Sequence, residues 1–181
     1  GAFLGPEFSQ SQIENELKDL GANFEILNED DLIFKTAKDI SEGNAVGWFQ
    51  GRMEFGPRAL GGRSILGDPR SKSMQKNLNL KVKYRESFRP FAPSILKDDL
   101  SKWFDMNSDS PYMLIVGNVK AEKCTDMTEE QKQLFGIEKL NVARSAIPAV
   151  THIDYSSRVQ TVNEQTNYKY FNLIAKFKEI T

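Results

Sequence analysis

The chain has 181 residues, of which 39% are hydrophobic and 27% are charged, and its formal net charge at pH 7 is -1. This size suits one domain with a buried core, and the small net charge excludes a global field that would attract nucleic acid or an anionic membrane. No apolar run approaches the roughly 20 residues that span a bilayer, and no signal segment stands at the start. Since Cys124 is the single cysteine, no internal disulfide can form, and we expect a cytoplasmic protein.

The first half of the sequence mixes helical and extended patterns. Apolar residues at helical spacing predict helices over 8–21, 28–43 and 71–84. A Ser or Asn precedes the apolar residues of each helix, and a Gly ends the first two helices. Short apolar runs over 45–49 and 63–68 favour strands. Helices and strands therefore both occur along this half, and extended segments also follow one another directly.

Prolines shape the middle of the chain. Pro90 and Pro93 exclude a helix over 88–96 and favour an extended backbone. A short helix is predicted over 96–104, and the apolar run over 110–119 indicates a strand.

The last third begins with a polar stretch over 120–146, which we interpret as a peripheral insertion. Two extended patterns follow, over 147–154 and 157–162, and predict a pair of strands joined by a turn. An amphipathic pattern over 167–180 predicts a final helix. The order of elements indicates an α/β domain with a mixed sheet.

Positive charge is concentrated in one stretch, from Arg52 to Arg89. Against three acidic residues the stretch has ten basic ones, a net +7 inside a chain of -1: Arg52, Arg58, Arg63, Arg70, Lys72, Lys76, Lys81, Lys83, Arg85 and Arg89. Three interpretations compete, namely a solvated basic face, a surface for a nucleic-acid backbone, and a compact site for phosphate groups.

The residue types favour the compact phosphate site. Glycines around the arginines let the backbone approach a ligand, and the planar guanidinium matches phosphate or carboxylate. Pro90 fixes the backbone directly after Arg89. Neither G-x-x-x-x-G-K-[ST] nor G-x-G-x-x-G is present, so neither common nucleotide-binding loop supplies the site.

Four blocks of sequence carry a family resemblance: GWFQGRMEFGPRALGGRSILGDPR, NLKVKYRESFRPFAPSIL, SPYML and IPAVTHIDYSSRVQTV. In order and spacing they closely resemble the C-terminal domain of the O-carbamoyltransferases, which modify antibiotics and nodulation factors. AFLGPEFS is similar to the family's entrance to that domain. The resemblance covers essentially all of residues 1–181.

The resemblance implies a YrdC-like fold, an open twisted α/β structure with a mixed sheet, flanking helices and a basic concave surface. It implies that ATP, with Mg²⁺, and carbamoyl phosphate are converted to carbamoyl adenylate and pyrophosphate. The partner would be an N-terminal domain of the sugar-kinase/actin-like kind in the same protein, which passes the carbamoyl group to a substrate hydroxyl. No membrane or nucleic-acid partner is implied.

Carried over by position, four residues resemble the family's site. Arg58 of GPRALG and Arg158 of SRVQT look like phosphate ligands, and Arg58 also like a ligand of carbamoyl phosphate. Lys83 and Arg89 are spaced like the basic pair that contacts the nucleotide phosphates and the carbamoyl group, and we expect them to be the catalytic residues.

Other residues have a weaker match. Arg52, Arg63 and Arg85 suit a supporting or a surface role equally well. Thr151 and His152 belong to a T-H-x-D pattern that suits a buried or supporting histidine, or one that contacts the carbamoyl group. We expect no metal site made of protein side chains alone, because that pattern offers too few ligands.

The sequence departs from the family pattern in two places. Gly62 stands where the family usually has Asn. Family members also continue into an apolar strand and an N-T-S-F-N segment that helps to bind the nucleotide, whereas this sequence stops at Thr181. We therefore expect a fragment of a longer chain, weakly active or inactive by itself, with an exposed strand edge that promotes self-association.

Other functions remain open at this point. A YrdC-like domain with a basic groove also suits a nucleic-acid-binding or a regulatory module without catalysis. Some YrdC-like proteins instead form an adenylate from an amino acid and bicarbonate.

Overall fold

The computed structural model describes all residues from 1 to 181. The α-helices are α1 (Gln10–Asp19), α2 (Glu29–Ser41), α3 (Met74–Lys81), α4 (Leu100–Trp103), α5 (Glu129–Gln133), α6 (Gly136–Leu140) and α7 (Tyr168–Ile180). The strands are β1 (Val46–Phe49), β2 (Arg63–Leu66), β3 (Ser94–Leu96), β4 (Phe104–Asp105), β5 (Ile115–Val119) and β6 (Ser156–Val162). Short 3₁₀ helices are η1 (Lys97–Asp99), η2 (Ala121–Lys123) and η3 (Pro148–Val150).

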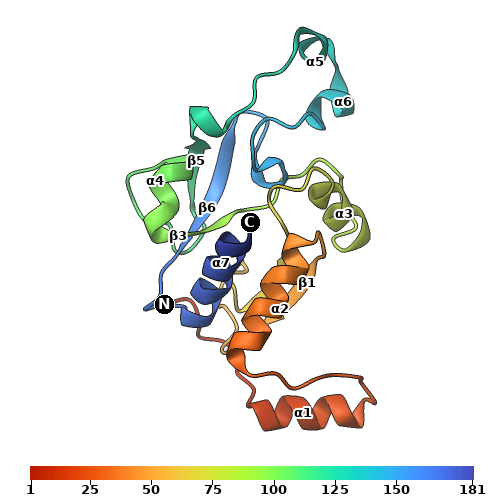
Figure 1. Ribbon diagram of the computed structural model, residues 1–181, viewed down its shortest axis with the longest axis vertical. Helices are drawn as coiled ribbons and strands as arrows, with labels where there is room; N and C mark the ends of the chain where they lie inside the picture. Colours follow the sequence, from red (N-terminus) through yellow and green to blue (C-terminus); the bar gives the residue numbers. More distant parts are fainter.

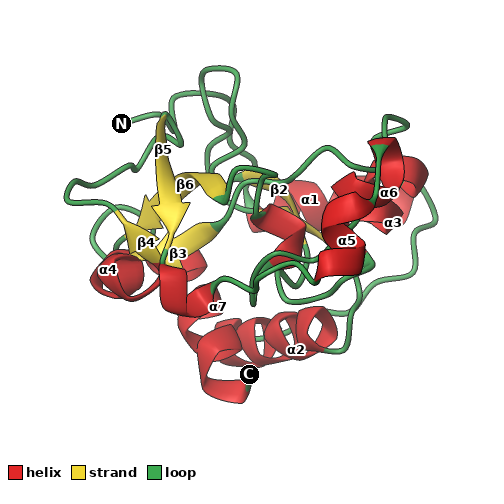
Figure 2. Cartoon of the chain, turned by 90° about the horizontal axis from the view of Figure 1, so that it is seen from above, coloured by secondary structure: helices red, strands yellow, loops and turns green.

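A four-stranded mixed sheet lies at the centre, in the order β3-β6-β5-β4. β3 runs parallel to β6, and the other two neighbouring pairs are antiparallel. Strands β1 and β2 form a separate antiparallel pair. In Figure 1, α2 and α7 lie side by side, α1 stands apart at one end, and α5 and α6 lie at the other. Seen from above, the four-stranded sheet lies to one side of α3, α5 and α6 (Figure 2). The predicted α/β architecture with a mixed sheet and flanking helices is confirmed.

Local signals explain the helices that the sequence predicts. The Ser9 side chain caps α1 in a capping box with Gln12. Asn28 accepts a hydrogen bond from the Asp31 N–H at 2.9 Å at the start of α2. The predicted helices over 8–21, 28–43, 71–84, 96–104 and 167–180 are confirmed, as are the strands over 45–49 and 63–68.

The predicted strand pair over 147–154 and 157–162 is wrong in its first member. Pro148, which suits the first position of a helix, begins η3, and Ala149 and Val150 are buried there. Only β6 forms, and it pairs with β3 and β5 instead.

The predicted strand over 110–119 is confirmed only in its second half. Met113 has a φ of 56° in the turn that precedes β5. In that turn the Ser110 N–H donates to the Thr161 hydroxyl at 2.9 Å. This segment is therefore tied to β6 before the regular pairing begins.

Two clusters of buried side chains hold the layers together. One lies between the sheet, α4 and η3: Leu100, Phe104, Met106, Val119, Ile147, Val150 and Val159. The other joins α2 and α7 to β1 and β6: Ala37, Trp48, Val162, Tyr170 and Leu173. Burying each large side chain contributes roughly 1.5–3 kcal/mol, so these clusters fix the sheet relative to the helices and to the loops between them.

Candidate functional site

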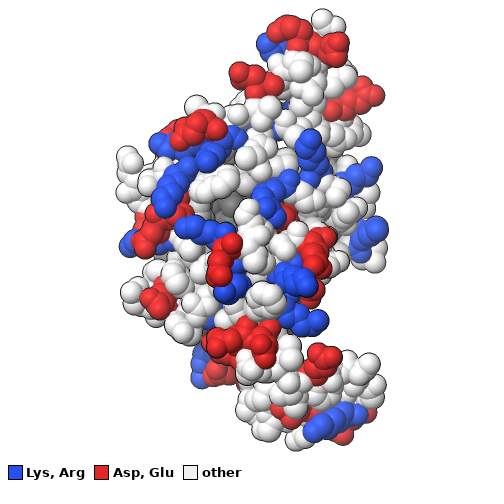
Figure 3. Space-filling model, in the orientation of Figure 1, with Lys and Arg blue, Asp and Glu red and all other residues white.

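A cavity of about 930 Å³ opens where three segments meet. Its walls come from the loop between β1 and β2, the segment 83–92 after α3, and the turn that leads into β6. Five cationic side chains line it: Arg58, Lys83, Arg85, Arg89 and Arg158. Asp154 is the one acidic residue in the lining. In Figure 3, Lys and Arg side chains gather around a hollow in the middle of the molecule, whereas acidic side chains crowd the α5–α6 end.

The loop that carries Arg58 is folded around a buried carboxylate. One Glu54 oxygen accepts hydrogen bonds from the N–H groups of Leu60 and Gly62, each at 2.7 Å, and from that of Arg63 at 3.2 Å. Burial would raise the pKa of Glu54, but these N–H donors outweigh burial and lower it. The carboxylate therefore stays ionised near neutral pH and holds both ends of the loop together.

Gln160 of β6 connects this loop to the sheet. Its side-chain nitrogen donates to the Leu60 carbonyl at 2.8 Å, and its oxygen accepts from the Ser94 hydroxyl at 2.9 Å. Gly61 lies against the ring of buried Tyr170, at a φ of +101° and with too little space for a Cβ. These contacts place Arg58 at the cavity from a loop without regular structure.

The segment with Lys83, Arg85 and Arg89 is fastened by one fully buried side chain, that of Asn79. Its nitrogen donates to the carbonyl oxygens of Ser87 at 3.1 Å and Arg89 at 2.8 Å, and its oxygen accepts from the Arg85 Nε at 2.6 Å. The segment is therefore held from the end of α3, with Lys83 exposed to the cavity.

Two cations at the cavity repel each other. Burial, and then the positive charge of Arg58, lower the pKa of the Arg158 guanidinium. The Arg58 Nε is buried and has no hydrogen-bond partner. An unpaired buried donor costs free energy, and an anion beside the two guanidinium groups would relieve their mutual repulsion.

The turn before β6 brings His152 and Asp154 to the same cavity. The imidazole Nδ1 lies 3.4 Å from an Asp154 carboxylate oxygen. Hydrogen bonds from the Ser156 hydroxyl at 2.6 Å and N–H at 3.1 Å lower the pKa of Asp154.

The residues that the sequence singles out thus divide into two groups. Arg58, Lys83, Arg89, Arg158 and His152 line one cavity, although they come from segments up to 100 positions apart, and Arg85 joins them. The other three residues that the sequence singles out, Arg52, Arg63 and Thr151, do not line this cavity.

These three residues have structural contacts instead. The Arg63 guanidinium donates to the carbonyls of Gln50, Gly51, Gly62 and Pro6, and stacks 3.5 Å from the Phe49 ring centroid. Arg52 contacts the Gly5 carbonyl and Glu7. The Thr151 hydroxyl is buried, donates to the Ile147 carbonyl at 2.9 Å and shares a hydrogen bond with Ser145.

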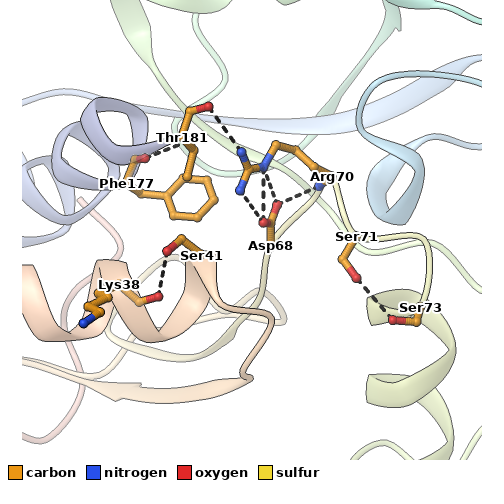
Figure 4. A network of polar contacts seen from close by, with 8 residues as sticks. All are labelled: Lys38, Ser41, Asp68, Arg70, Ser71, Ser73, Phe177 and Thr181. Carbon is orange, nitrogen blue, oxygen red and sulfur yellow. Dashed lines mark hydrogen bonds and ion pairs between the residues drawn. The ribbon is translucent and has the colours of Figure 1, made fainter.

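Arg70, also from the basic stretch, has a local role as well. It lies 2.7 Å from the Asp68 carboxylate, and its Nη1 donates to the Thr181 carbonyl at 3.3 Å (Figure 4). Its guanidinium lies over the ring of Phe177 at 5.4 Å. The ion pair orients the Arg70 side chain, and its contacts with Thr181 and Phe177 attach the end of α7 to the turn after β2.

Sequence reasoning missed Asn79, Glu54 and Gln160, which do not line the cavity but position the cations that do. Glu54 did have a signal, because it is one of three acids in a stretch with ten basic residues. Asn79 lies between two leucines in α3. Nothing local marks Gln160, because its loop partner Leu60 is 100 residues away.

No three His, Cys, Asp or Glu side chains lie together as a potential metal site. No helix is long and apolar enough to cross a membrane.

The family model of the carbamoyltransferase C-terminus matches residues 37–181. The chain belongs to the carbamoyltransferase C-terminal family. Among curated relatives, it is 38% identical over 99% of its length to the nodulation protein NolNO of Sinorhizobium fredii, covering 24% of that protein. It is 36% identical over 77% of its length to the 3'-hydroxymethylcephem-O-carbamoyltransferase of Streptomyces clavuligerus, covering 22% of it.

A third relative is an uncharacterized protein of Synechocystis sp., which is 54% identical over 100% of this chain. The carbamoyltransferase C-terminal domain described here spans between 22% and 30% of the length of these three relatives. The expected resemblance to this family is confirmed, and the relatives are much longer proteins.

Proposed function

We propose that this domain forms carbamoyl adenylate and pyrophosphate from Mg-ATP and carbamoyl phosphate, on a YrdC-like fold whose basic concave surface is the cavity. A separate N-terminal domain would then transfer the carbamoyl group to a hydroxyl, such as the one named in the cephem carbamoyltransferase. The observation that carries the proposal is the convergence of five cationic side chains on one cavity in a carbamoyltransferase domain.

The charge of the reactants requires such a site. A triphosphate and an acyl phosphate together bring about six negative charges, which repel each other strongly unless cations lie between them. The mutual repulsion of Arg58 and Arg158 supports a bound phosphate. A cavity of about 930 Å³ is also within the range of nucleotide-sized ligand sites.

The reaction has two balanced steps. Carbamoyl phosphate and water give carbamate and inorganic phosphate. A carbamate oxygen then attacks the α-phosphorus of ATP, the bond to the β-phosphate oxygen breaks, and pyrophosphate leaves with the electron pair. No side-chain nucleophile is needed, so positioning and electrostatic stabilisation supply the catalysis.

In this scheme each cation has a role. Arg58 and Arg158 would hold the phosphate of carbamoyl phosphate. Lys83 and Arg89 would contact the nucleotide phosphates and the carbamoyl group, and would stabilise the charge that develops on the leaving pyrophosphate. Mg²⁺ would be carried by the phosphate oxygens of the nucleotide, where it neutralises charge.

The test is a calorimetric titration of Mg-ATP into the chain, with and without carbamoyl phosphate, beside Lys83→Ala and the control Lys81→Ala. Lys81 is exposed on the last turn of α3 and does not line the cavity. We expect saturable binding that Lys83→Ala weakens about tenfold or more, as expected for a lost charge-assisted contact, and that Lys81→Ala preserves.

An assay of pyrophosphate release with both substrates completes the test. If Lys83→Ala and Lys81→Ala lose affinity equally, and the chain binds RNA with a steep dependence on salt, a nucleic-acid-binding module would be favoured instead. Because we expect this chain to be weakly active or inactive by itself, the assay includes a longer chain with the segment that the family resemblance implies, and nucleotide binding without pyrophosphate release by that chain would favour a regulatory module.

A further inference from the structure

His152 stands where two cavities adjoin. The second cavity, of about 810 Å³, lies between the segment 125–145 and the body of the domain, and shares Arg89, Pro90 and His152 with the first. The imidazole is about half exposed, at 49% of its side-chain surface. Water can therefore reach this side chain next to the cationic cavity.

The backbone of His152 is held on both sides. Its N–H donates to the Ser156 carbonyl at 2.8 Å, and its carbonyl accepts from the Tyr155 N–H at 3.0 Å. Tyr155 has a left-handed φ of 65°, which closes the turn tightly. The position of the imidazole at the cavity is therefore set by the turn.

The Asp154 carboxylate lies beside the imidazole of His152. The carboxylate is ionised near neutral pH, because hydrogen bonds from Ser156 lower its pKa, and it faces Nδ1 at 3.4 Å. This separation is long for a hydrogen bond, but such contacts often tighten when the substrate binds. A carboxylate beside Nδ1 favours the tautomer with the proton there, which leaves Nε2 free to accept one.

No other lining group can act as a base as readily. Five of the titratable groups are cations, and Asp154 is a weak base because hydrogen bonds from Ser156 lower its pKa. Burial raises the pKa of Tyr170 to about 12, so its phenol stays protonated at neutral pH. His152 is the remaining titratable side chain in the lining.

This inference rests on the proposed function, in which carbamoyl phosphate must become carbamate before adenylation. We propose that His152 is the general base of that hydrolysis. Nε2 removes a proton from water, the water oxygen bonds to phosphorus, and the bond between phosphorus and the carbamoyl oxygen breaks. The electron pair stays on the carbamate oxygen, and the imidazolium returns its proton to solvent.

Charged groups line both cavities that adjoin at His152. Asp154 lies 3.4 Å from the imidazole Nδ1, and the first cavity is lined by the five cations Arg58, Lys83, Arg85, Arg89 and Arg158. The second cavity adds Lys72, Asp126, Glu138 and Arg144. The cations of the first cavity hold the phosphate and the leaving carbamate, and the Asp154 carboxylate stabilises the imidazolium that forms.

The first experiment measures release of inorganic phosphate from carbamoyl phosphate without ATP, by the unsubstituted chain and by His152→Asn. We expect the variant to be slower by about 100-fold or more, the usual contribution of general-base catalysis. In the second, ammonium carbamate replaces carbamoyl phosphate, and pyrophosphate release from Mg-ATP is measured. The variant should form pyrophosphate from carbamate, because this route bypasses the water step.

Chemical rescue separates a base from a structural residue. Imidazole added to His152→Gly should restore phosphate release above the rate of imidazole alone. The inference is overturned if the unsubstituted chain does not accelerate phosphate release, or if His152→Asn keeps the full rate of phosphate release. It is also overturned if His152→Asn loses phosphate release and pyrophosphate release equally and imidazole does not restore phosphate release to His152→Gly. If the unsubstituted chain makes no pyrophosphate from either source, the adenylation proposal fails, while phosphate release still decides the role of His152.

Discussion

Asn79 holds Arg89 from ten positions earlier in the chain, through a hydrogen bond of 2.8 Å from its side-chain nitrogen to the Arg89 carbonyl oxygen. The same side chain accepts from the Arg85 Nε and donates to the Ser87 carbonyl. Three points of the cationic segment therefore depend on one buried amide, and that segment is otherwise a loop without regular secondary structure.

Replacing this amide should affect stability and binding together. Asn79→Ala removes a fully buried amide and its hydrogen bonds to three half-buried partner atoms, and we expect the free energy of unfolding to fall by about 1–3 kcal/mol. Since small misplacements of binding groups are costly, Mg-ATP affinity should fall about tenfold or more. Urea denaturation and calorimetry measure the two effects. Asn77→Ala, at an exposed site on the same helix, is the matched control, and equal effects in both variants would contradict this role.

The Arg58–Arg158 repulsion predicts a response to anions. Because the folded chain lowers the pKa of Arg158, its charged form is disfavoured in the fold, and at pH 7 this penalty is present in full. Arg158→Met should raise the melting temperature without phosphate. At a phosphate concentration of ten times its Kd, the free energy of unfolding of the unsubstituted chain should rise by roughly 1.4 kcal/mol. That of Arg158→Met should rise much less.

Thermal unfolding in phosphate and in chloride at equal ionic strength checks the anion effect. Arg52→Met is the control, because Arg52 contacts Gly5 and Glu7 away from the cavity. A similar rise in melting temperature in chloride would show general screening of the positive charges instead of a phosphate site.

The elements with local signals could be predicted, and those set by distant partners could not. The capping box at Ser9 and the acidic first turn of α2 depend on neighbouring residues, so both helices follow from the sequence. The partner of β6 in parallel pairing is β3, more than 60 positions earlier, and the sequence shows no sign of it. With that partner hidden, the sequence favours a strand over 147–154 as the partner of 157–162, where the structure has η3 and a turn.

The candidate site divides in the same way. Cationic side chains are visible in the sequence because charge is a property of each residue and ten of them cluster. Which cations face the cavity depends on Glu54, Gln160 and Asn79, whose hydrogen bonds exist only in the folded chain. Arg63 shows the limit, since it lies beside Arg58 in sequence but donates to backbone carbonyls away from the cavity.

Gly61 and Gly56 provide a test of how tightly the Arg58 loop is packed. Both have a positive φ, of +101° and +127°, but a Cβ at Gly61 would lie 2.5 Å from the Tyr170 ring, whereas one at Gly56 would meet nothing. Gly56→Ala should cost about 1–3 kcal/mol of unfolding free energy from backbone strain alone. Gly61→Ala should cost at least about 1 kcal/mol more because of the overlap. Urea denaturation of both variants measures the difference, and equal costs would mean that the ring moves away freely.

Glu54 predicts a pH dependence. Despite burial, its N–H donors lower its pKa from the usual 4.5, so its contribution to stability is complete above pH 4.5 and is lost as the pH falls through the lowered value. Glu54→Gln should therefore be less stable than the unsubstituted chain at pH 7, by about 1–3 kcal/mol, because a neutral amide oxygen accepts the three N–H bonds more weakly than the ionised carboxylate does. This gap, the difference in unfolding free energy between the two chains, should narrow as the pH falls below 4.5.

Urea denaturation between pH 7 and pH 3 measures this gap. Glu25→Gln, at an exposed position, should follow the unsubstituted chain throughout, which separates the buried carboxylate from the general effect of acid. Asp99 and Asp154 also have lowered pKa values, so both chains lose stability in acid, and only the difference between them reports on Glu54. A gap that stays constant down to pH 3 would mean that the loop does not depend on the ionised carboxylate.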